Sequence, residues 1–234
     1  MQKQIELPAA VIFDMDGVLV NSNPFHLAKW VDFLNNHRIS YREEELPELI
    51  LGMRNDTAFR YFFGPEITKE ESDELSEELE AAFRKAFKPF AKPLPGLDAL
   101  IKECHAAGVP MAVASSAMRK NIEFVVDALG YRSYFRTMVS GDEVTHAKPD
   151  PEIYLKAAGH LGIDPADAVA FEDSYVGIGA VKNAGIKCVA IASTFPIEKL
   201  VPLADLAVPG FEHINLEKLR TLFVAEGESS QVAR

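Results

Sequence analysis

The sequence predicts an α/β fold, in which a parallel sheet surrounded by helices carries an inserted segment made only of helices. Two observations predict it. Short apolar segments alternate with amphipathic helical patterns from residue 97 to residue 208, and this alternation is typical of a parallel sheet with right-handed crossovers. Between residues 21 and 92 the pattern is helical throughout. The chain of 234 residues is long enough for such a core plus a small insertion.

The first predicted strand covers residues 9–13 and is entirely apolar. Such a short apolar run suits a central parallel strand that is covered on both faces. The strand ends at Asp14 and Asp16, two carboxylates that are followed by Gly17. Because open α/β sheets bind their ligands at the carboxyl ends of their strands, we expect the chemistry of the protein at this point.

The insertion begins with a helix whose apolar residues recur at helical spacing, as in Trp30 and Leu34. Asn23 suits the N-cap of this helix and Pro24 its first turn. Further helices are expected over 44–51 and 56–63, and a fourth helix has apolar residues spaced by four from Leu75 to Phe87. The last of them carries acidic residues on its other side, which predicts a solvent-exposed face: Glu70, Glu71, Asp73, Glu74, Glu77, Glu78 and Glu80.

Four prolines and glycines between residues 89 and 96 break the helical pattern and indicate a linker. The predicted core therefore comprises residues 1–22 and 93–234, and the predicted insertion residues 23–92. The rest of the core repeats helix and strand. Its helices are expected near 97–104, 122–129, 150–161 and 176–184, and its strands near 111–114, 137–139, 169–171, 188–191 and 206–208.

Polar side chains follow three of these later strands. Ser115 and Ser116 come after the second strand, Lys148 lies in the loop after the third, and Glu172 and Asp173 end the fourth. Together with Asp14 and Asp16 this inventory suits phosphoryl transfer. Asp14 can attack phosphorus and Asp16 can exchange a proton with the leaving oxygen. The acidic residues offer hard oxygen ligands for Mg²⁺, while Ser115 and Lys148 can hold phosphate oxygens.

Composition excludes several other classes of function. With 24 basic and 35 acidic residues the net charge is −11, which argues against nucleic acid or an anionic membrane as partner. Cys104 and Cys188 lie in apolar patterns and are expected to be reduced core residues. No apolar run approaches the roughly 18 residues of a membrane span, and no signal peptide is recognisable. A cytoplasmic monomer that acts on a small-molecule phosphate ester is expected.

The motifs occur in the order and spacing of a known family. Asp14-Met15-Asp16-Gly17-Val18, Ser115, Lys148 and Glu172-Asp173 resemble the motifs of the haloacid dehalogenase-like phosphatases. The long interval from residue 21 to residue 95 resembles the β-phosphoglucomutase-like branch, whose insertion is a helical cap. The resemblance covers about residues 11–208 and implies a Rossmann-like core.

The resemblance also implies roles for individual residues. It implies a phospho-Asp14 intermediate and a Mg²⁺ ion held by the side chains of Asp14 and Asp173 and the backbone carbonyl of Asp16. Glu172 would contribute to the metal directly or through water. Lys148 would bind the transferring phosphate and pair with the nucleophile, and the Ser115 hydroxyl and the amides beside it, at Ser116, would bind phosphate oxygens.

For the substrate, the resemblance points to the cap. His26 matches a histidine near the substrate in this branch, although a purely structural histidine fits the sequence equally well. The loop Gly52-Met53-Arg54-Asn55 matches the loop that reads the leaving group. Arg54 could meet an anionic group there, or it could be an ordinary exposed arginine.

Two alternatives to a phosphatase stay open, a mutase and a binding protein, and a third, a dehalogenase, fits the residues less well. A β-phosphoglucomutase would return the phosphoryl group to a sugar, but here the cap arginine and lysine of that enzyme are replaced by Asn55 and Leu51. Its Ser-Lys-Asn falls at residues 117–119, which are Ala-Met-Arg, so only Arg54 and Arg119 could compensate. A non-catalytic binding protein on the same fold has no need of Asp16. A dehalogenase would have little use for the acidic pair Glu172-Asp173.

Overall fold

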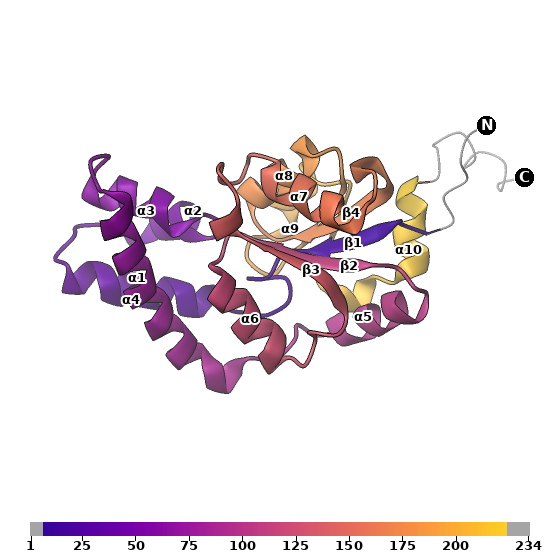
Figure 1. Ribbon diagram of the computed structural model, residues 1–234, viewed down its shortest axis with the longest axis horizontal. Coiled ribbons are helices and arrows are strands. Elements are labelled where there is room, and N and C mark those ends of the chain that lie inside the picture. Colours follow the sequence, from indigo (N-terminus) through magenta and orange to yellow (C-terminus); the bar gives the residue numbers. More distant parts are fainter. Residues whose placement is uncertain (1–6, 224–234) are drawn as a thin grey trace, which may run out of the picture.

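The computed structural model describes residues 7–223 and contains a six-stranded sheet in which all paired strands are parallel (Figure 1). The strand order is β3-β2-β1-β4-β5-β6, which is the Rossmann-type order. The strands are β1 (Ala10–Phe13), β2 (Met111–Ser115), β3 (Phe135–Ser140), β4 (Ala168–Glu172), β5 (Lys187–Ile191) and β6 (Leu206–Val208). The predicted α/β core is therefore confirmed, although β3 is longer than the apolar run 137–139.

Helices cover both faces of the sheet. The core helices are α5 (Leu97–Ala106), α6 (Arg119–Ala128), α7 (Glu152–Leu161), α8 (Tyr175–Asn183), α9 (Ile197–Leu200) and α10 (Leu216–Arg220). One apolar cluster joins α5, α6 and α10 to the face of β1 that carries Phe13. A second cluster joins α7, α8 and α9 to the opposite face, which carries Ile12. This alternation along β1 follows from the two-residue period of a strand, and it buries β1 completely at the centre of the molecule.

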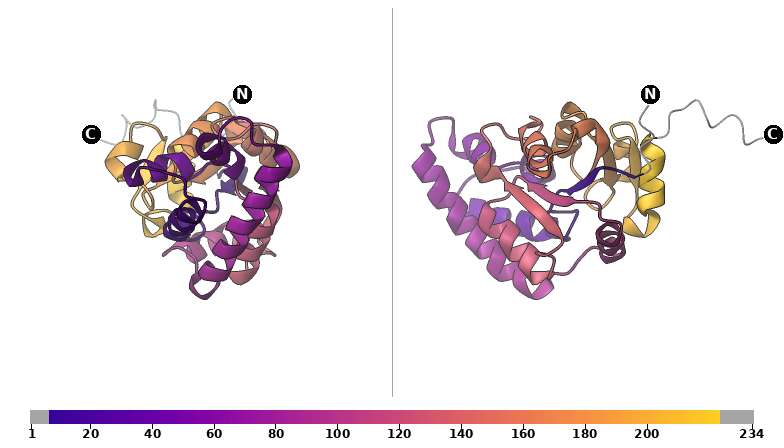
Figure 2. Two further views of the ribbon diagram at one scale, coloured as in Figure 1. Left: turned by 90° about the vertical axis from the view of Figure 1, so that its left-hand side faces the viewer. Right: turned by 45° about the vertical axis from the view of Figure 1, so that its right-hand side comes forward.

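The insertion consists of helices and has its own apolar core. Its helices are α1 (Asn23–Asn36), α2 (Leu46–Ile50), α3 (Asn55–Phe63) and α4 (Lys69–Phe87). They lie to one side of the sheet, and the long helix α4 reaches helix α6 of the core (Figure 2). The two crossings between insertion and core run side by side, since the Leu94 N–H donates to the Leu19 carbonyl over 3.0 Å. The inserted helical cap is confirmed, and we propose that it covers residues 23–92.

Three details differ from the sequence-based expectations. Asn23 is the first residue of α1, and Ser22 precedes it without a side-chain capping bond, so the predicted N-cap is wrong. The expected helix over 44–51 is a 3-10 turn, Glu43–Glu45, followed by the five-residue α2. Helix α7 begins at Glu152, two residues after Asp150, whose carboxylate accepts the Glu152 N–H. The predicted ends of the core at residues 1 and 234 lie outside the described residues.

Two further sequence-based expectations concern the cysteines and membrane-spanning helices. Cys104 and Cys188 are both buried free thiols, as expected for core cysteines. Within residues 7–223, no helix is both long and apolar enough to cross a membrane.

Trp30 should dominate the stability of the insertion. Its side chain is 1% exposed, and its ring lies 5.0 Å from that of Phe59 and 5.8 Å from that of Phe33. Trp30→Ala should lower the free energy of unfolding by about 3–5 kcal/mol, because it removes a large ring from a packed core. Urea denaturation followed by circular dichroism measures this. Tyr61→Ala, at an aromatic residue that is 60% exposed, should change the same quantity by less than about 0.5 kcal/mol.

Candidate active site

The carboxyl ends of the two central strands bring Asp14 and Asp173 together. Asp14 follows β1 and its N–H donates to the Phe171 carbonyl of β4 over 3.0 Å. Gly17 turns the chain back with a φ of +77°, and a Cβ added there would lie 1.9 Å from Oδ2 of Asp173. Only glycine combines this backbone conformation with such a close approach. The glycine after the two aspartates therefore serves the contact between the first and the fourth strand.

Lys148 joins two of the predicted acidic residues. Its Nζ donates to Oδ1 of Asp14 over 2.7 Å and to Oε1 of Glu172 over 2.6 Å, and the side chain of Lys148 is almost completely buried. Tyr154, on α7, donates its hydroxyl to the same Glu172 oxygen over 2.7 Å. The other Glu172 oxygen accepts the Asp173 N–H over 3.0 Å. Glu172 is thus the inner support of this ion-pair network.

The network holds more negative than positive charge. Burial raises the pKa of Asp14 to about 8, the charges of Glu172 and Asp16 add to the shift, and Lys148 opposes it. Burial and the charges of Glu172 and Asp14 also raise the pKa of Asp173 well above its ordinary value. Three buried carboxylates facing one lysine are costly. An additional cation would relieve this repulsion.

The same carboxylates have the geometry and chemistry to hold a divalent cation. Asp14, Glu172 and Asp173 each offer a carboxylate oxygen, and these atoms lie within 4.8 Å of one another. Asn23 donates to Oδ2 of Asp173 over 2.9 Å and Thr194 bonds to the same oxygen, so Asp173 is held in place. Oxygen ligands and fixed carboxylates suit Mg²⁺. The donor set therefore fits a hard divalent cation.

Asp16 lies outside this network and has partners of its own. Ser22 donates its hydroxyl to Oδ1 of Asp16 over 2.5 Å, and Nε2 of His26 lies 3.2 Å from the same oxygen. Burial alone would raise the pKa of Asp16, but His26 and Ser22 outweigh it and lower this pKa. Burial likewise opposes the charge on His26, but Asp16 and Glu80 raise the pKa of His26. The ring of His26 stacks on Phe83 with centroids 3.8 Å apart.

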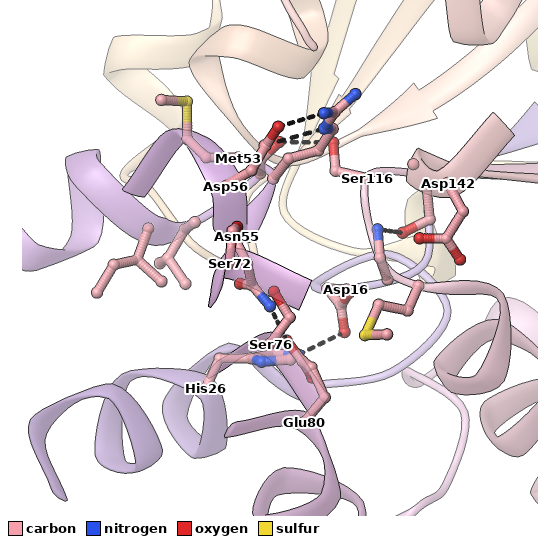
Figure 3. A pocket seen from close by; sticks show the side chains of 18 of the residues that line it. Asp16, His26, Met53, Asn55, Asp56, Ser72, Ser76, Glu80, Ser116 and Asp142 are labelled. Carbon is pink, nitrogen blue, oxygen red and sulfur yellow. Dashed lines mark hydrogen bonds and ion pairs between the residues drawn. The ribbon is translucent and has the colours of Figure 1, made fainter. Parts of the chain in front are cut away.

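A cavity of about 680 Å³ opens between the core and the insertion. The core contributes Asp14, Asp16, Ser115 and Ser116, and the insertion contributes residues of α1, α3 and α4 (Figure 3). All the substrate-binding candidates from the sequence line this one cavity: His26, Gly52, Arg54, Asn55 and Ser116. Lys148, Glu172 and Asp173 are not among its lining residues, but they contact Asp14, which does line it, or one another.

The predicted residues of the cap loop are bonded to protein groups. The guanidinium of Arg54 pairs with Asp56 and donates to the Val144 carbonyl over 2.9 Å. Ser116 donates its hydroxyl to the Gly52 carbonyl over 2.9 Å, which ties the insertion to the core. Ser115 instead accepts the Ala117 N–H over 3.2 Å and so shapes the turn after β2.

The acidic face predicted for α4 is wrong at one residue. Glu80 is 5% exposed and lines the cavity. Its two oxygens accept hydrogen bonds from the amides of Asn55, over 2.7 Å, and Asn121 of α6, over 2.5 Å. These amides replace the solvent that a carboxylate would otherwise need. A run of acidic residues therefore indicates solvent exposure only where no side chain from another element forms hydrogen bonds with them.

Sequence reasoning also missed several residues that position the site. These are Ser22, Asn23, Tyr154, Thr194, Asn121 and Glu80. One signal for Glu80 was present in the sequence, because Ser72, Ser76 and Glu80 recur every four residues and so share one face of α4. For Thr194, which bonds to Asp173 from the segment after β5, the sequence carries no signal.

Comparisons with known proteins agree with this geometry. Residues 11–191 match the sequence model of a family described as haloacid dehalogenase-like hydrolase. The chain belongs to this family. It is 30% identical over 210 residues to validoxylamine A 7'-phosphate phosphatase of Streptomyces hygroscopicus subsp. limoneus, covering 87% of this chain and 96% of that protein. It is 28% identical over 217 residues to β-phosphoglucomutase of Bacillus subtilis, covering 90% of this chain and 93% of that protein.

Solved structures of haloacid dehalogenase-like proteins share the whole arrangement. A family hydrolase from Entamoeba histolytica superposes with a TM-score of 0.82 at 26% identity, covering 91% of this chain and 98% of that chain. The resemblance inferred from the motifs is thereby confirmed. Together with the phosphatases among its relatives, the family membership makes this chain a haloacid dehalogenase-like phosphatase.

Proposed function

We propose that this phosphatase is a Mg²⁺-dependent phosphohydrolase that acts on a small phosphorylated metabolite, such as a sugar phosphate, through a phospho-Asp14 intermediate. The observation that carries the proposal is that Asp14 and Asp16, only two residues apart in the sequence, have different interaction partners. Asp14 belongs to the network with Lys148, and Asp16 belongs to a separate group with His26 and Ser22. Two roles, nucleophile and proton carrier, need two such different environments.

Each residue then has a defined part in the reaction. A carboxylate oxygen of Asp14 attacks phosphorus, and the bond from phosphorus to the leaving oxygen breaks. Asp16 gives a proton to that oxygen, and His26, 3.2 Å away, is the group from which we expect Asp16 to draw it. Water then attacks the phosphorus of phospho-Asp14, and Asp16 takes up the proton of the water. Ester and water thus become alcohol and phosphate.

Charge is the main obstacle, because a carboxylate must approach a phosphate dianion. Lys148 contacts Asp14, and we assign to it the pairing with the transferring group. We assign Ser115 and the amide of Ser116, which line the cavity, to the remaining phosphate oxygens. The side chains of Asp14 and Asp173, with Glu172 behind them and the carbonyl of Asp16, would hold Mg²⁺. Bound there, the ion would neutralise both the nucleophile and the phosphate.

The mutase alternative needs a cationic site for a second phosphate. The two arginines that could form one have other partners. Arg54 pairs with Asp56, and Arg119 pairs with Glu143 and donates to the Met138 carbonyl over 2.8 Å. This favours transfer to water over transfer back to a sugar. A cytoplasmic location and a monomeric state stay predictions.

Phosphate release from a panel of phosphorylated metabolites tests the proposal. Wild-type protein should release phosphate from at least one ester when Mg²⁺ is present. EDTA should reduce the rate by at least about 100-fold, because the repulsion between Asp14 and the phosphate is then no longer screened. Restoring Mg²⁺ in excess should restore the rate, which serves as the control for irreversible damage. Release that is unaffected by EDTA would overturn the metal dependence, and release from no ester would overturn the proposed hydrolase.

A further inference from the structure

Helix α4 presents three polar side chains to the cavity. Ser72, Ser76 and Glu80 follow one another at intervals of four residues, so they share one face of the helix. Their exposed fractions are 5%, 8% and 5%, and all three line the cavity. Figure 3 shows Ser76 and Glu80 on the side of the cavity where Asp16 and His26 lie. This face, here called the α4 face, therefore lies beside Asp16 and His26, the residues to which we assign proton transfer to the leaving group.

The two serine hydroxyls are available to a ligand. Both serines line the cavity, and neither hydroxyl is among the buried side-chain atoms without a partner in residues 7–223, so both are open to the cavity. A ligand that fills the cavity can therefore replace water at these two hydroxyls. Because a hydroxyl both donates and accepts, they match the hydroxyl groups of a polyol.

Glu80 adds an acceptor and a negative charge. Each of its oxygens accepts one bond from an asparagine amide, which leaves capacity for a further donor at each. Acidic side chains outnumber basic ones along the cavity. His26, Arg54 and Lys69 each pair with another acid, namely Asp16, Asp56 and Asp73. Arg60 also lines the cavity, which gives it six carboxyl groups against four basic side chains: Asp14, Asp16, Asp56, Asp73, Glu80 and Asp142 against His26, Arg54, Arg60 and Lys69. A second anionic group on the substrate would meet the Glu80 carboxylate.

We propose that the α4 face is the leaving-group subsite and that it selects polyhydroxylated leaving groups without a second anionic group. Ser72 and Ser76 bind hydroxyls of the leaving group, and Glu80 accepts from a further hydroxyl while it repels a carboxylate or a second phosphate. Glu80 is thus the specificity-determining residue. This inference rests on the proposed phosphohydrolase function and names the substrate class for it.

A matched pair of esters tests the selectivity. Glucitol 6-phosphate and 6-phosphogluconate share the same carbon chain and phosphate, and differ by one terminal alcohol against one carboxylate. Wild-type protein with Mg²⁺ should show a kcat/KM at least about tenfold higher for glucitol 6-phosphate, because like charges face each other in the other complex. Glu80→Gln keeps the shape of the side chain and should reduce this ratio by at least about tenfold. Ser76→Ala should raise the KM for glucitol 6-phosphate by about 3- to 10-fold.

Glu78→Gln is the matched control. It makes the same charge change on the exposed side of α4, and the ratio should stay at its wild-type value. If wild-type protein shows equal kcat/KM values for the two esters, the proposed subsite is wrong but the phosphohydrolase function is not. The subsite is also wrong if Glu80→Gln leaves the ratio of the two kcat/KM values unchanged.

Binding separates the two proposals and does not depend on turnover. Asp14→Asn protein with Mg²⁺ can be titrated with each ester in a calorimeter. Binding of glucitol 6-phosphate at least about tenfold more tightly than 6-phosphogluconate supports the subsite even if no ester is hydrolysed. Equal affinities overturn it, whatever the outcome for hydrolysis and whether or not Glu80→Gln folds.

Discussion

Asp14→Asn should reduce Mg²⁺-dependent phosphate release by on the order of 10⁴-fold or more. The amide cannot attack phosphorus, and removal of a nucleophile that acts as part of a unit leaves only the contribution of binding. The measurement is phosphate release at saturating substrate, with phosphoenzyme trapped by acid quench from radiolabelled ester. Label should appear on wild-type protein and not on the variant.

The variant should keep its fold. Burial raises the pKa of Asp14 to about 8, far above its ordinary 3.8, so the folded state at neutral pH carries a penalty that the unfolded chain does not. A neutral amide removes this penalty and leaves Lys148 paired with Glu172. We therefore expect a melting temperature equal to or above that of the wild type. Loss of activity with a lowered melting temperature would point to a structural role for Asp14.

A matched control lies at the other end of the sheet. Asp167 immediately precedes β4 at its amino end, away from the rim that carries Asp14. Asp167→Asn makes the same chemical change and should keep at least about half of the wild-type rate. Label on Asp14→Asn protein would show that another residue carries the phosphoryl group.

The parallel sheet explains why so much of the site could be predicted from the sequence. Asp14, Ser115 and Glu172 each stand at the end of an apolar strand, and the carboxyl ends of neighbouring parallel strands meet at one rim. Residues that follow neighbouring strands are therefore close in space even when they are far apart in the sequence. Lys148 was harder, because it lies in a loop several residues after the third strand, and the family spacing supported its assignment.

The remaining contacts could not be predicted because they join elements that are distant in sequence. Glu80 was assigned to solvent because its own helix is acidic, but Asn55 and Asn121 lie on other helices. Asn23 was assigned to a helix cap because local propensity favours it there. Its amide instead bonds to Asp173, 150 residues away. In both cases a tertiary partner outweighed a local preference.

Lys148→Met should destabilise the protein by about 3–5 kcal/mol, the second large effect that we expect. Lys148 is the cation between Asp14 and Glu172, at 2.7 Å and 2.6 Å, and its side chain is 1% exposed. Removing one member of a buried ion pair leaves uncompensated charge, whereas the apolar side chain of methionine fills a similar volume. Urea denaturation without added metal measures the loss. Activity should fall as well, since Asp14 then lacks its cationic partner.

The pH dependence of this loss separates an electrostatic cause from a packing defect. Lys148 holds the pKa of Glu172 below its ordinary value of 4.5 against the effect of burial, so without Lys148 this pKa rises above 4.5. An acid whose folded-state pKa exceeds its unfolded value costs stability increasingly as the pH rises from the unfolded to the folded-state pKa. The destabilisation should therefore be smaller at about pH 5 than at about pH 8. A packing defect would be the same at both.

Lys182→Met provides the comparison for an exposed pair. Lys182 contacts Asp205 at 2.8 Å, but its side chain is 43% exposed, and ion pairs of this kind contribute at most about 1 kcal/mol. Its loss should be small and weakly dependent on pH. Equal effects of the two lysine substitutions would mean that solvent reaches Lys148 and screens its charge. The carboxylates around it would then be less strained than their burial implies, and the case for a cation held between them would weaken.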